Sequence, residues 1–324
     1  MAVAERPTPL PAPDPLLRRL RMRDLQLLAM LDEVGSLSAA AAALSLTQPA
    51  VSKILVELEQ IFGSRLFERG RRGVEPTPIG LAAIRRARSI VGELGLASAE
   101  LKAMREGAAG LLQLGTFSIT DIVPKALAEL MRRHPGVAVR IREGAIAELL
   151  TLLLQGELDC VFAAMPPDLL ARGAIRRLRW QAMFDDRLCA LLSDRHPLAG
   201  GRALRWRDLA QARWVAMPTD TVVRQRFMEA FVGEGLEPPQ PVVETLSPIT
   251  IAALVREDPS LIGLARHESA GQQSLLPGIR RLALDPKMPL PSMCLITRRS
   301  AEGEGPLLKS FADCIRAAAR SRRL

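Results

Sequence analysis

Few residues of this 324-residue chain could do acid–base, nucleophilic or metal chemistry, and they are widely separated. The sequence holds three His and four Cys, and it contains no GxSxG, HExxH, GxxxxGK[ST] or GxGxxG string. His134 and His196 each precede a proline, which favours loops at the ends of elements over general bases. The four Cys are spaced too widely for a CxxC metal pair, and their apolar neighbours predict buried thiols. We therefore expect no enzyme, no metal site and no cofactor.

Basic side chains are the other chemistry that the sequence offers. The chain has 44 Lys and Arg against 35 Asp and Glu, a formal net charge of +9, which permits nucleic-acid binding without requiring it. The densest basic cluster near the start is RLFERGRRG, which ends with Arg71, Arg72 and a glycine. A β-hairpin with these two arginines at its tip would suit phosphates or the minor groove. A solvated surface is the other interpretation.

Three segments with helical spacing of apolar residues precede this cluster. The first segment, 23–34, is ended by Gly35, and Ser36 or Ser38 can cap a second, Ala-rich helix. A third helix is predicted to begin after Thr47. Two short helices joined by a tight turn and followed by a hairpin are typical of a winged helix-turn-helix.

The third helix presents polar side chains at its start. Pro49 suits the first turn, because a residue there has no intrahelical partner for its N–H. Gln48, Ser52 and Lys53 remain on the polar face, where a recognition helix presents side chains to base edges in the major groove. The N-terminal segment therefore predicts binding to double-stranded DNA.

The stretch 19–80 resembles the winged helix-turn-helix of LysR-type transcriptional regulators. The resemblance rests on GSLSAA, TQPAVS, LEQIFGSRLFER and TPIG. It implies DNA contacts at the start of the third helix and in the wing, with Lys53 standing where Arg is common, so that a point charge replaces a bidentate fork. The candidate DNA-binding residues are Ser36, Ser38, Thr47, Gln48, Pro49, Ser52, Lys53, Arg71 and Arg72.

A long helix is predicted after the hairpin, beginning at Thr77 and Pro78, which supply a cap and a first-turn proline. In the family this linker helix pairs two DNA-binding domains, so the resemblance implies a homodimer or homotetramer. Packing on its own domain is the other interpretation of the helix. A seven-residue repeat permits a dimer seam of Ile84, Ala87, Val91, Leu94, Ser98 and Leu101.

Strand and helix patterns alternate beyond Gly110, which predicts a parallel, doubly wound sheet. Such sheets bind ligands at the carboxyl ends of their strands. Because the chain leaves one set of strands, builds another and returns, we expect two lobes, as in the periplasmic-binding-protein-like effector domain of LysR regulators. The expected strands are 111–117, 137–141, 158–165, 186–193, 212–217, 241–245, 261–265 and 293–299.

The predicted fold class is α/β, with an all-α-type winged helix-turn-helix N-terminal domain and a C-terminal two-lobed α/β sensor domain. Lobe 1 would comprise residues 110–181 and 286–324, and lobe 2 residues 182–285. The predicted organisation is a flexible tail at 1–19, the DNA-binding domain at 20–77, a linker and dimerisation helix at 78–107, and the effector-binding domain at 110–324.

Residues that follow the strands of the sensor are the candidate effector-binding residues. Hydroxyls and free N–H groups at helix starts suit an anionic carboxylate, although the same residues serve as ordinary caps and turns. Many relatives place Thr where this chain has Ala145, and Arg224 and Arg266 are alternative counter-charges, with surface positions as the simpler interpretation. The candidates are Thr116, Phe117, Ser118, Thr120, Glu143, Gly144, Ala145, Met217, Pro218, Thr219, Thr221, Ser247 and Ile249.

Taken with the resemblance, these patterns predict a cytoplasmic LysR-type transcriptional regulator that responds to a small-molecule co-inducer. The longest uncharged run, 34–52, lacks the apolar content of a membrane span, and the Pro-rich start has no cationic segment before an apolar core. The expected partners are double-stranded promoter DNA, a small anionic effector, RNA polymerase if the protein activates, and further copies of the chain. The alternative is a constitutive DNA-binding accessory protein without a small-molecule response.

Overall fold

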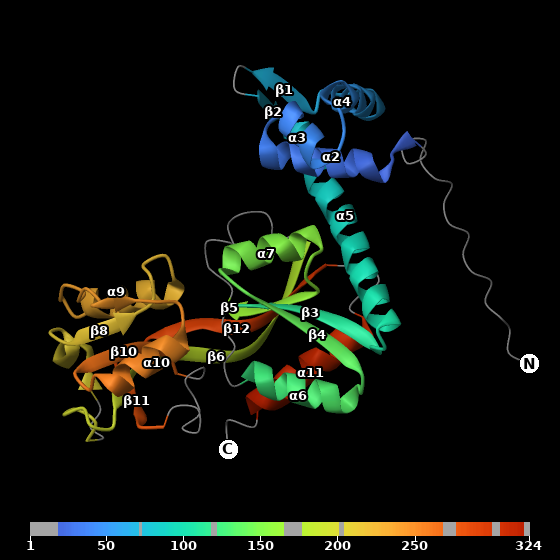
Figure 1. Ribbon diagram of the computed structural model, residues 1–324. Coiled ribbons are helices and arrows are strands. Elements are labelled where there is room, and N and C mark those ends of the chain that lie inside the picture. Colours follow the sequence, from blue (N-terminus) through green and yellow to red (C-terminus); the bar gives the residue numbers. More distant parts are fainter. Residues whose placement is uncertain are drawn as a thin grey trace, which may run out of the picture. The chain divides into compact units, whose positions relative to one another are not determined.

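The computed structural model divides into two compact units. It describes residues 19–70, 73–117, 122–164, 177–200, 204–267, 277–299 and 305–320. Unit 1 is Met1–Ala99 with Leu154–Glu157, and unit 2 is Glu100–Leu153 with Leu158–Leu324 (Figure 1). The tail predicted at 1–19 lies, except for Arg19, outside the described residues.

Unit 1 contains three short helices, a two-stranded hairpin and most of a long helix. Gly35 ends the first helix in the left-handed conformation, at φ 63°, and its carbonyl accepts the Val74 N–H at 2.9 Å. A Cβ at Gly73 would lie 2.1 Å from that carbonyl oxygen, so the hairpin approaches this turn closely enough to require glycine. The elements are α2 (Met22–Val34), α3 (Leu37–Ala43), α4 (Gln48–Phe62), β1 (Phe67–Gly70), β2 (Gly73–Pro76) and α5 (Pro78–Arg105).

The core of unit 1 joins the three short helices to the hairpin. Leu28 of α2 and Leu55 of α4 are buried in one cluster, and Phe67 brings the hairpin into it. The Glu59 carboxylate accepts the backbone N–H groups of Leu66 at 2.8 Å and Phe67 at 3.3 Å, which fixes the hairpin to the end of α4. The predicted helix-turn-helix and wing are therefore confirmed as structure.

The long helix α5 corrects the predicted dimer seam. Thr77 caps it as expected, accepting the Gly80 N–H at 3.0 Å. Ile84 and Ala87 are each 1% exposed and belong to the core of unit 1, so they are not available to a second chain. Their apolar spacing serves packing within their own unit, while other apolar residues of α5 stay exposed.

No single helix among the described residues is long and apolar enough to cross a membrane. By length and composition alone, the bent pair of α3 and α4, at 106°, passes the same test. The apolar side chains of this pair, such as Leu55 and Leu58, lie in the core of unit 1.

Unit 2 is built on one sheet of ten strands among the described residues, in the order β4-β3-β5-β12-β6-β10-β8-β9, with β11 paired to β6 and β7 paired to β11. The predicted elements occur in the predicted order, but β7 and β11 were not predicted. The sheet is mixed and not parallel, because β6 and β12 pair antiparallel with their neighbours. The first elements are β3 (Gly110–Thr116), α6 (Ile122–Arg133), β4 (Val137–Glu143), α7 (Ile146–Gln155), β5 (Cys160–Ala164) and β6 (Leu178–Ser193). The remaining elements are β7 (Leu204–Arg205), the 3₁₀ helix η2 (Trp206–Leu209), β8 (Arg213–Ala216), α9 (Val222–Val232), β9 (Val243–Glu244), α10 (Pro248–Glu257), β10 (Leu261–Arg266), β11 (Ile279–Asp285), β12 (Pro289–Arg298) and α11 (Pro306–Arg320).

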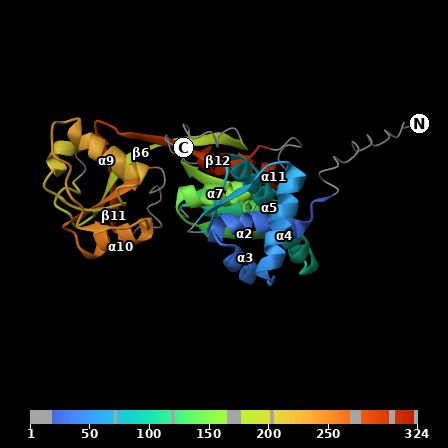
Figure 2. The same ribbon diagram turned by 90° about the horizontal axis from the view of Figure 1, so that it is seen from above.

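Each half of this sheet has its own core. Lobe 1 packs β3, β5 and β12 against α6 and α11, and lobe 2 surrounds Trp206, Trp214, Phe227 and Phe231, whose rings meet edge to face. In lobe 1 the helices α6 and α7 lie on opposite faces of the sheet, and in lobe 2 so do α9 and α10 (Figures 1 and 2). This is the arrangement that right-handed crossovers give when the strand order reverses.

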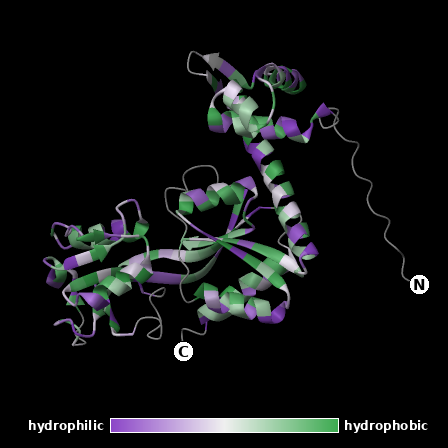
Figure 3. Cartoon of the chain, viewed as in Figure 1, coloured by the Kyte–Doolittle hydropathy of each residue, from purple (hydrophilic) through white to green (hydrophobic). Residues whose placement is uncertain are grey.

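Strands β6 and β12 run through both lobes. Sequence patterns predicted β6 only over 186–193, whereas the strand begins at Leu178 and has 16 residues. Its first half pairs with β12 in lobe 1, and its second half pairs with β10 and β11 in lobe 2. The first half, 178–185, is mostly exposed and lacks the continuous apolar run by which the second half was predicted, and hydrophilic residues follow at the crossing (Figure 3).

A buried ion pair lies at this crossing. The Arg266 Nε donates to Asp186 Oδ2 at 3.0 Å, and the two side chains are 3% and 0% exposed. Arg266 also donates from Nη2 to the Pro291 carbonyl at 2.9 Å, and Asp186 accepts the Arg187 N–H. Three strands, β6, β10 and β12, therefore meet in one polar cluster. The interpretation of Arg266 as a surface residue is wrong.

We expect Asp186→Asn to lower the free energy of unfolding by about 3–5 kcal/mol, because it leaves the buried Arg266 guanidinium without a counter-charge. Urea unfolding followed by circular dichroism measures this change. The matched control is Asp185→Asn, since Asp185 is exposed and its substitution should cost less than about 1 kcal/mol. Equal effects of the two substitutions would contradict the role of the pair.

Candidate functional site

The start of α4 presents an exposed polar surface. Thr47 is the N-cap, and its Oγ1 accepts the Ala50 N–H at 3.4 Å. Gln48, Pro49 and Lys53 are exposed, and Ser52 is half-buried. The predicted residues are thus brought together on the first two turns of one helix, with a cap that fixes where the helix begins.

The opposite face of α4 is held by the core. Val51, Leu55 and Leu58 are at most 2% exposed, so the orientation of the polar face is set by packing. Two further residues lie on the exposed polar face and were not predicted. Val56 is 44% exposed, and Glu57 lies 4.0 Å from Lys53. The spacing of four residues between Lys53 and Glu57 could have indicated this pair.

Ser36 and Ser38 occupy different positions at the start of α3. Ser36 is the N-cap and accepts the Ala39 N–H at 3.4 Å, whereas Ser38 is exposed within the helix. The hairpin that should carry the basic tip is present, with Gly70 paired to Gly73. Arg71 and Arg72 themselves lie outside the described residues.

The carboxyl ends of the parallel strands in both lobes point towards the crossing of β6 and β12. In lobe 1, Ala164 at the end of β5 pairs with Met293, near the crossing end of β12. In lobe 2, Arg266 at the end of β10 pairs with Leu188, where β6 enters that lobe. Because β3 and β4 run parallel to β5, and β8 and β9 parallel to β10, the strand ends within each lobe share one direction, and both sets run towards the crossing. Open α/β sheets bind ligands at such edges.

The lobe 1 candidates differ in what they can offer at this edge. The Thr116 side chain is fully buried, and its hydroxyl donates to the Phe162 carbonyl at 3.1 Å. Phe117 packs on the core of lobe 1. Glu143 and Ala145 are exposed, with Gly144 between them half-buried and its N–H bound to the Thr116 carbonyl at 3.3 Å. Ser118 and Thr120 lie outside the described residues.

The lobe 2 candidates are mainly cap and turn residues. Thr221 Oγ1 donates to the Pro218 carbonyl at 2.8 Å and accepts the Arg224 N–H at 3.2 Å, as the N-cap of α9. Ser247 caps α10 in the same way, through the Thr250 N–H. Thr219 and Ile249 are exposed. Met217 requires a correction, because its side chain is 4% exposed and belongs to the core of lobe 2.

Arg224 is buried, which corrects its interpretation as a surface residue. It is 1% exposed, and its guanidinium lies over the Phe227 ring with Cζ 5.1 Å from the centroid. Its Nε and Nη1 atoms have no hydrogen-bond partner. Burial lowers the pKa of Arg224, and the charge of Glu244 acts in the opposite direction.

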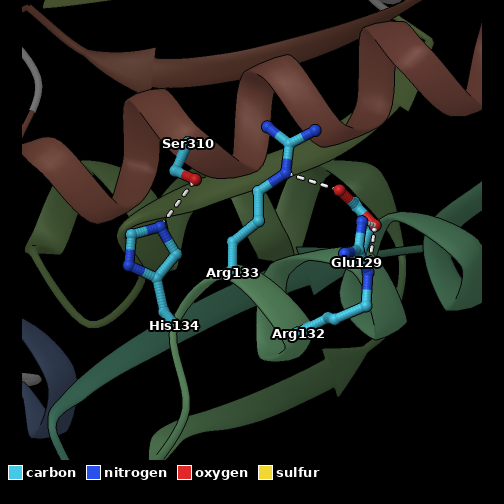
Figure 4. Close-up of polar contacts among 5 residues, drawn as sticks. All are labelled: Glu129, Arg132, Arg133, His134 and Ser310. Carbon is cyan, nitrogen blue, oxygen red and sulfur yellow. Dashed lines mark hydrogen bonds and ion pairs between the residues drawn. The ribbon is translucent and has the colours of Figure 1, made fainter.

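His267 directly follows the end of β10, and its Nε2 lies 3.0 Å from Arg187 Nη2, whereas His134 lies away from these strand ends. His134 follows α6, and its Nε2 contacts Ser310 Oγ at 2.7 Å (Figure 4). The nearby Glu129 is bound by Arg132 and Arg133, whose hydrogen bonds lower its pKa. Among the described residues no carboxylate is hydrogen-bonded to His134, so the Ser–His pair lacks the acid that would orient a general base. The four cysteines are buried thiols, as predicted.

Two family models match the chain. The model described as "Bacterial regulatory helix-turn-helix protein, lysR family" matches residues 22–81, and "LysR substrate binding domain" matches residues 105–320. The HTH-type transcriptional regulator GbpR of Azospirillum brasilense is 34% identical over 276 residues, covering 83% of this chain and 80% of that protein. GbpR of Rhizobium radiobacter is 33% identical, covering 78% and 85%.

Solved structures share the fold. Full-length CbnR complexed with its target DNA superposes with a TM-score of 0.57 at 21% identity, covering 92% of this chain and 100% of that one. The matched models place a DNA-binding helix-turn-helix in unit 1 and an effector-binding domain in unit 2. The chain belongs to the LysR family, and it is a transcriptional regulator that binds DNA through its helix-turn-helix, not an enzyme.

Proposed function

We propose that the first two turns of α4 read base edges of promoter DNA while the wing contacts phosphates. The observation that carries this proposal is the two-sided character of α4, whose apolar face is locked in the core while Gln48 and Lys53 are exposed at its capped start. A glutamine can form paired hydrogen bonds with adenine, and a lysine donates to guanine or to a phosphate. Such a protein acts in the cytoplasm, where bacterial DNA lies.

We propose that unit 2 binds a small anionic effector where the strand ends of the two lobes converge. β6 and β12 connect the lobes at that place, so a ligand held by both lobes would change the angle between them. This change would alter the assembly and the bending of the DNA, with RNA polymerase as a further partner if the protein activates. A constitutive accessory protein would differ, because its DNA binding would ignore every small molecule.

We propose that α5 forms the contact between two copies of the chain, within a dimer or tetramer. The exposed apolar residues of α5 follow steps of four and three, the spacing of a coiled-coil seam. This seam is shifted from the predicted one because Ile84 and Ala87 are used in unit 1. It consists of Ile90, Leu94, Ala97, Leu101 and Met104, of which the four large residues are 46–62% exposed.

Gln48→Ala should weaken binding to the cognate operator by about 1–3 kcal/mol and leave random DNA almost unchanged, because it removes a base contact. Arg72→Ala should weaken binding to both DNAs and reduce the salt slope by about one. Fluorescence anisotropy with a selected operator and a random duplex, between 50 and 200 mM salt, measures both effects. Equal losses on the two DNAs for Gln48→Ala would contradict base reading.

Glu57→Gln should raise the affinity for operator and random DNA alike, by about two- to fivefold, because it removes a negative charge beside Lys53 on the DNA-binding face. The same titrations detect it, and the gain should shrink at high salt. Glu33→Gln is the matched control, since Glu33 is exposed on α2. An unchanged affinity for Glu57→Gln would show that this face of α4 does not lie against the DNA.

Leu94→Glu should raise the dissociation constant of the dimer at least about 100-fold, because it removes a buried leucine from each of two chains. Sedimentation velocity over a range of protein concentrations measures this constant. Lys102→Glu introduces the same carboxylate on α5 outside the seam and should sediment like the unchanged protein. A variant Leu94→Glu that still sediments like the unchanged protein would show that α5 is not the interface.

A further inference from the structure

Lobe 2 buries two guanidinium groups and satisfies only one of them. Arg266 has the Asp186 carboxylate and the Pro291 carbonyl as acceptors. Arg224, at 1% exposure, has no acceptor for Nε or Nη1. These are the two buried basic side chains in the described part of the chain. A buried charge without a partner destabilises the fold. Lobe 2 therefore contains one buried guanidinium that is paired and one that is not.

The guanidinium of Arg224 is fixed at the carboxyl edge of the lobe 2 sheet. Arg224 is the third residue of α9, behind the cap made by Thr221, and its cation rests on the Phe227 ring. The charge of Glu244, at the end of β9, acts on it, and Glu244 pairs with Ala216 at the end of β8. Phe227 is itself fully buried, so the cation has little freedom to turn towards solvent.

No anion from the described chain pairs with Arg224. Glu244 acts on its charge without forming an ion pair with it. The next basic residue on α9, Arg226, is by contrast half-exposed and bound to Glu229 at 2.6 Å. Arg224 is therefore distinguished from Arg226 by its burial and by the absence, among the described residues, of an ion-pair partner.

We propose that Arg224 is the counter-charge for a carboxylate group of the effector, which binds to lobe 2 at the start of α9. The inference rests on the proposed effector function and adds the residue and the lobe that hold the anion. A planar guanidinium binds a carboxylate through two parallel hydrogen bonds, and the first turn of α9 adds the positive end of its helix dipole. In the complex, the effector carboxylate would give Arg224 the counter-charge that Asp186 gives to Arg266.

This role has a consequence for the protein without effector. A side chain kept for binding, and unpaired until the ligand arrives, destabilises the ligand-free fold. Replacing it with an apolar side chain of similar length should leave the ligand-free protein as stable or make it more stable. A purely structural arginine would show the opposite, because its loss would break contacts within lobe 2.

The test compares thermal unfolding of the full chain and of Arg224→Met with sodium acetate, succinate or benzoate added, at ionic strength matched with sodium chloride. We expect a saturable rise in unfolding temperature for the unchanged protein with at least one carboxylate. Arg224→Met should unfold at the same or a higher temperature without carboxylate and need at least about tenfold more carboxylate for half of the rise. Arg226→Met, on the same helix, should respond like the unchanged protein.

Several results would overturn the proposal. A ligand-free Arg224→Met protein that unfolds several degrees lower assigns Arg224 a structural role, and Arg224→Lys, which keeps the charge without the fork, then tests the carboxylate response in a folded protein. An undiminished carboxylate response in both variants places the anion elsewhere and leaves the effector function standing. No response of the unchanged protein to any of the three carboxylates removes the carboxylate class. A rise in unfolding temperature with inorganic phosphate, and with none of the three carboxylates, would also remove the carboxylate class.

Discussion

The two-lobed arrangement of unit 2 depends on the ion pair between Asp186 and Arg266. Transferring both charges out of water is costly, and their close contact together with the Pro291 and Arg187 backbone groups offsets that cost. A slip of β6 by one residue would turn Asp186 to the other face of the sheet and leave Arg266 alone. The pair therefore fixes the register of the strands at the place where the chain passes between lobes.

In unit 1 a corresponding constraint acts through backbone groups. Glu59 binds two N–H groups of the hairpin, and Thr77 binds the carbonyl of Arg65 at 2.9 Å before it caps α5. A Cβ at Gly80 would lie 1.9 Å from the Leu66 carbonyl oxygen, so α5 begins in close contact with the hairpin. Helix, hairpin and linker are thereby joined by hydrogen bonds in addition to their shared apolar core, and the polar face of α4 stays exposed.

Local patterns in the sequence predict most of this structure, since caps, turns and apolar periods are local properties. Thr47, Thr77 and Gly35 act as expected, and the predicted strands and helices of unit 2 occur in the predicted order, although β7 and β11 were not predicted. The first half of β6 escaped prediction because it lacks the continuous apolar run of the second half and stays mostly exposed. Arg224 and Arg266 escaped for another reason, because their burial is decided by strands that are distant in the sequence.

The candidate effector site also separates what local sequence predicts from what distant parts of the chain decide. Its hydroxyl residues were predicted from strand ends, yet Thr116, Thr221 and Ser247 already satisfy backbone groups of their own chain. Ala145 offers no donor from its side chain at the end of β4. Among the buried side chains that the structure describes at this edge of the sheet, what remains unsatisfied is the charge on Arg224 and not a hydroxyl. Recognition by charge requires an anionic partner but tolerates variety in its carbon skeleton, because the guanidinium reads the carboxylate and the surrounding side chains must read the rest.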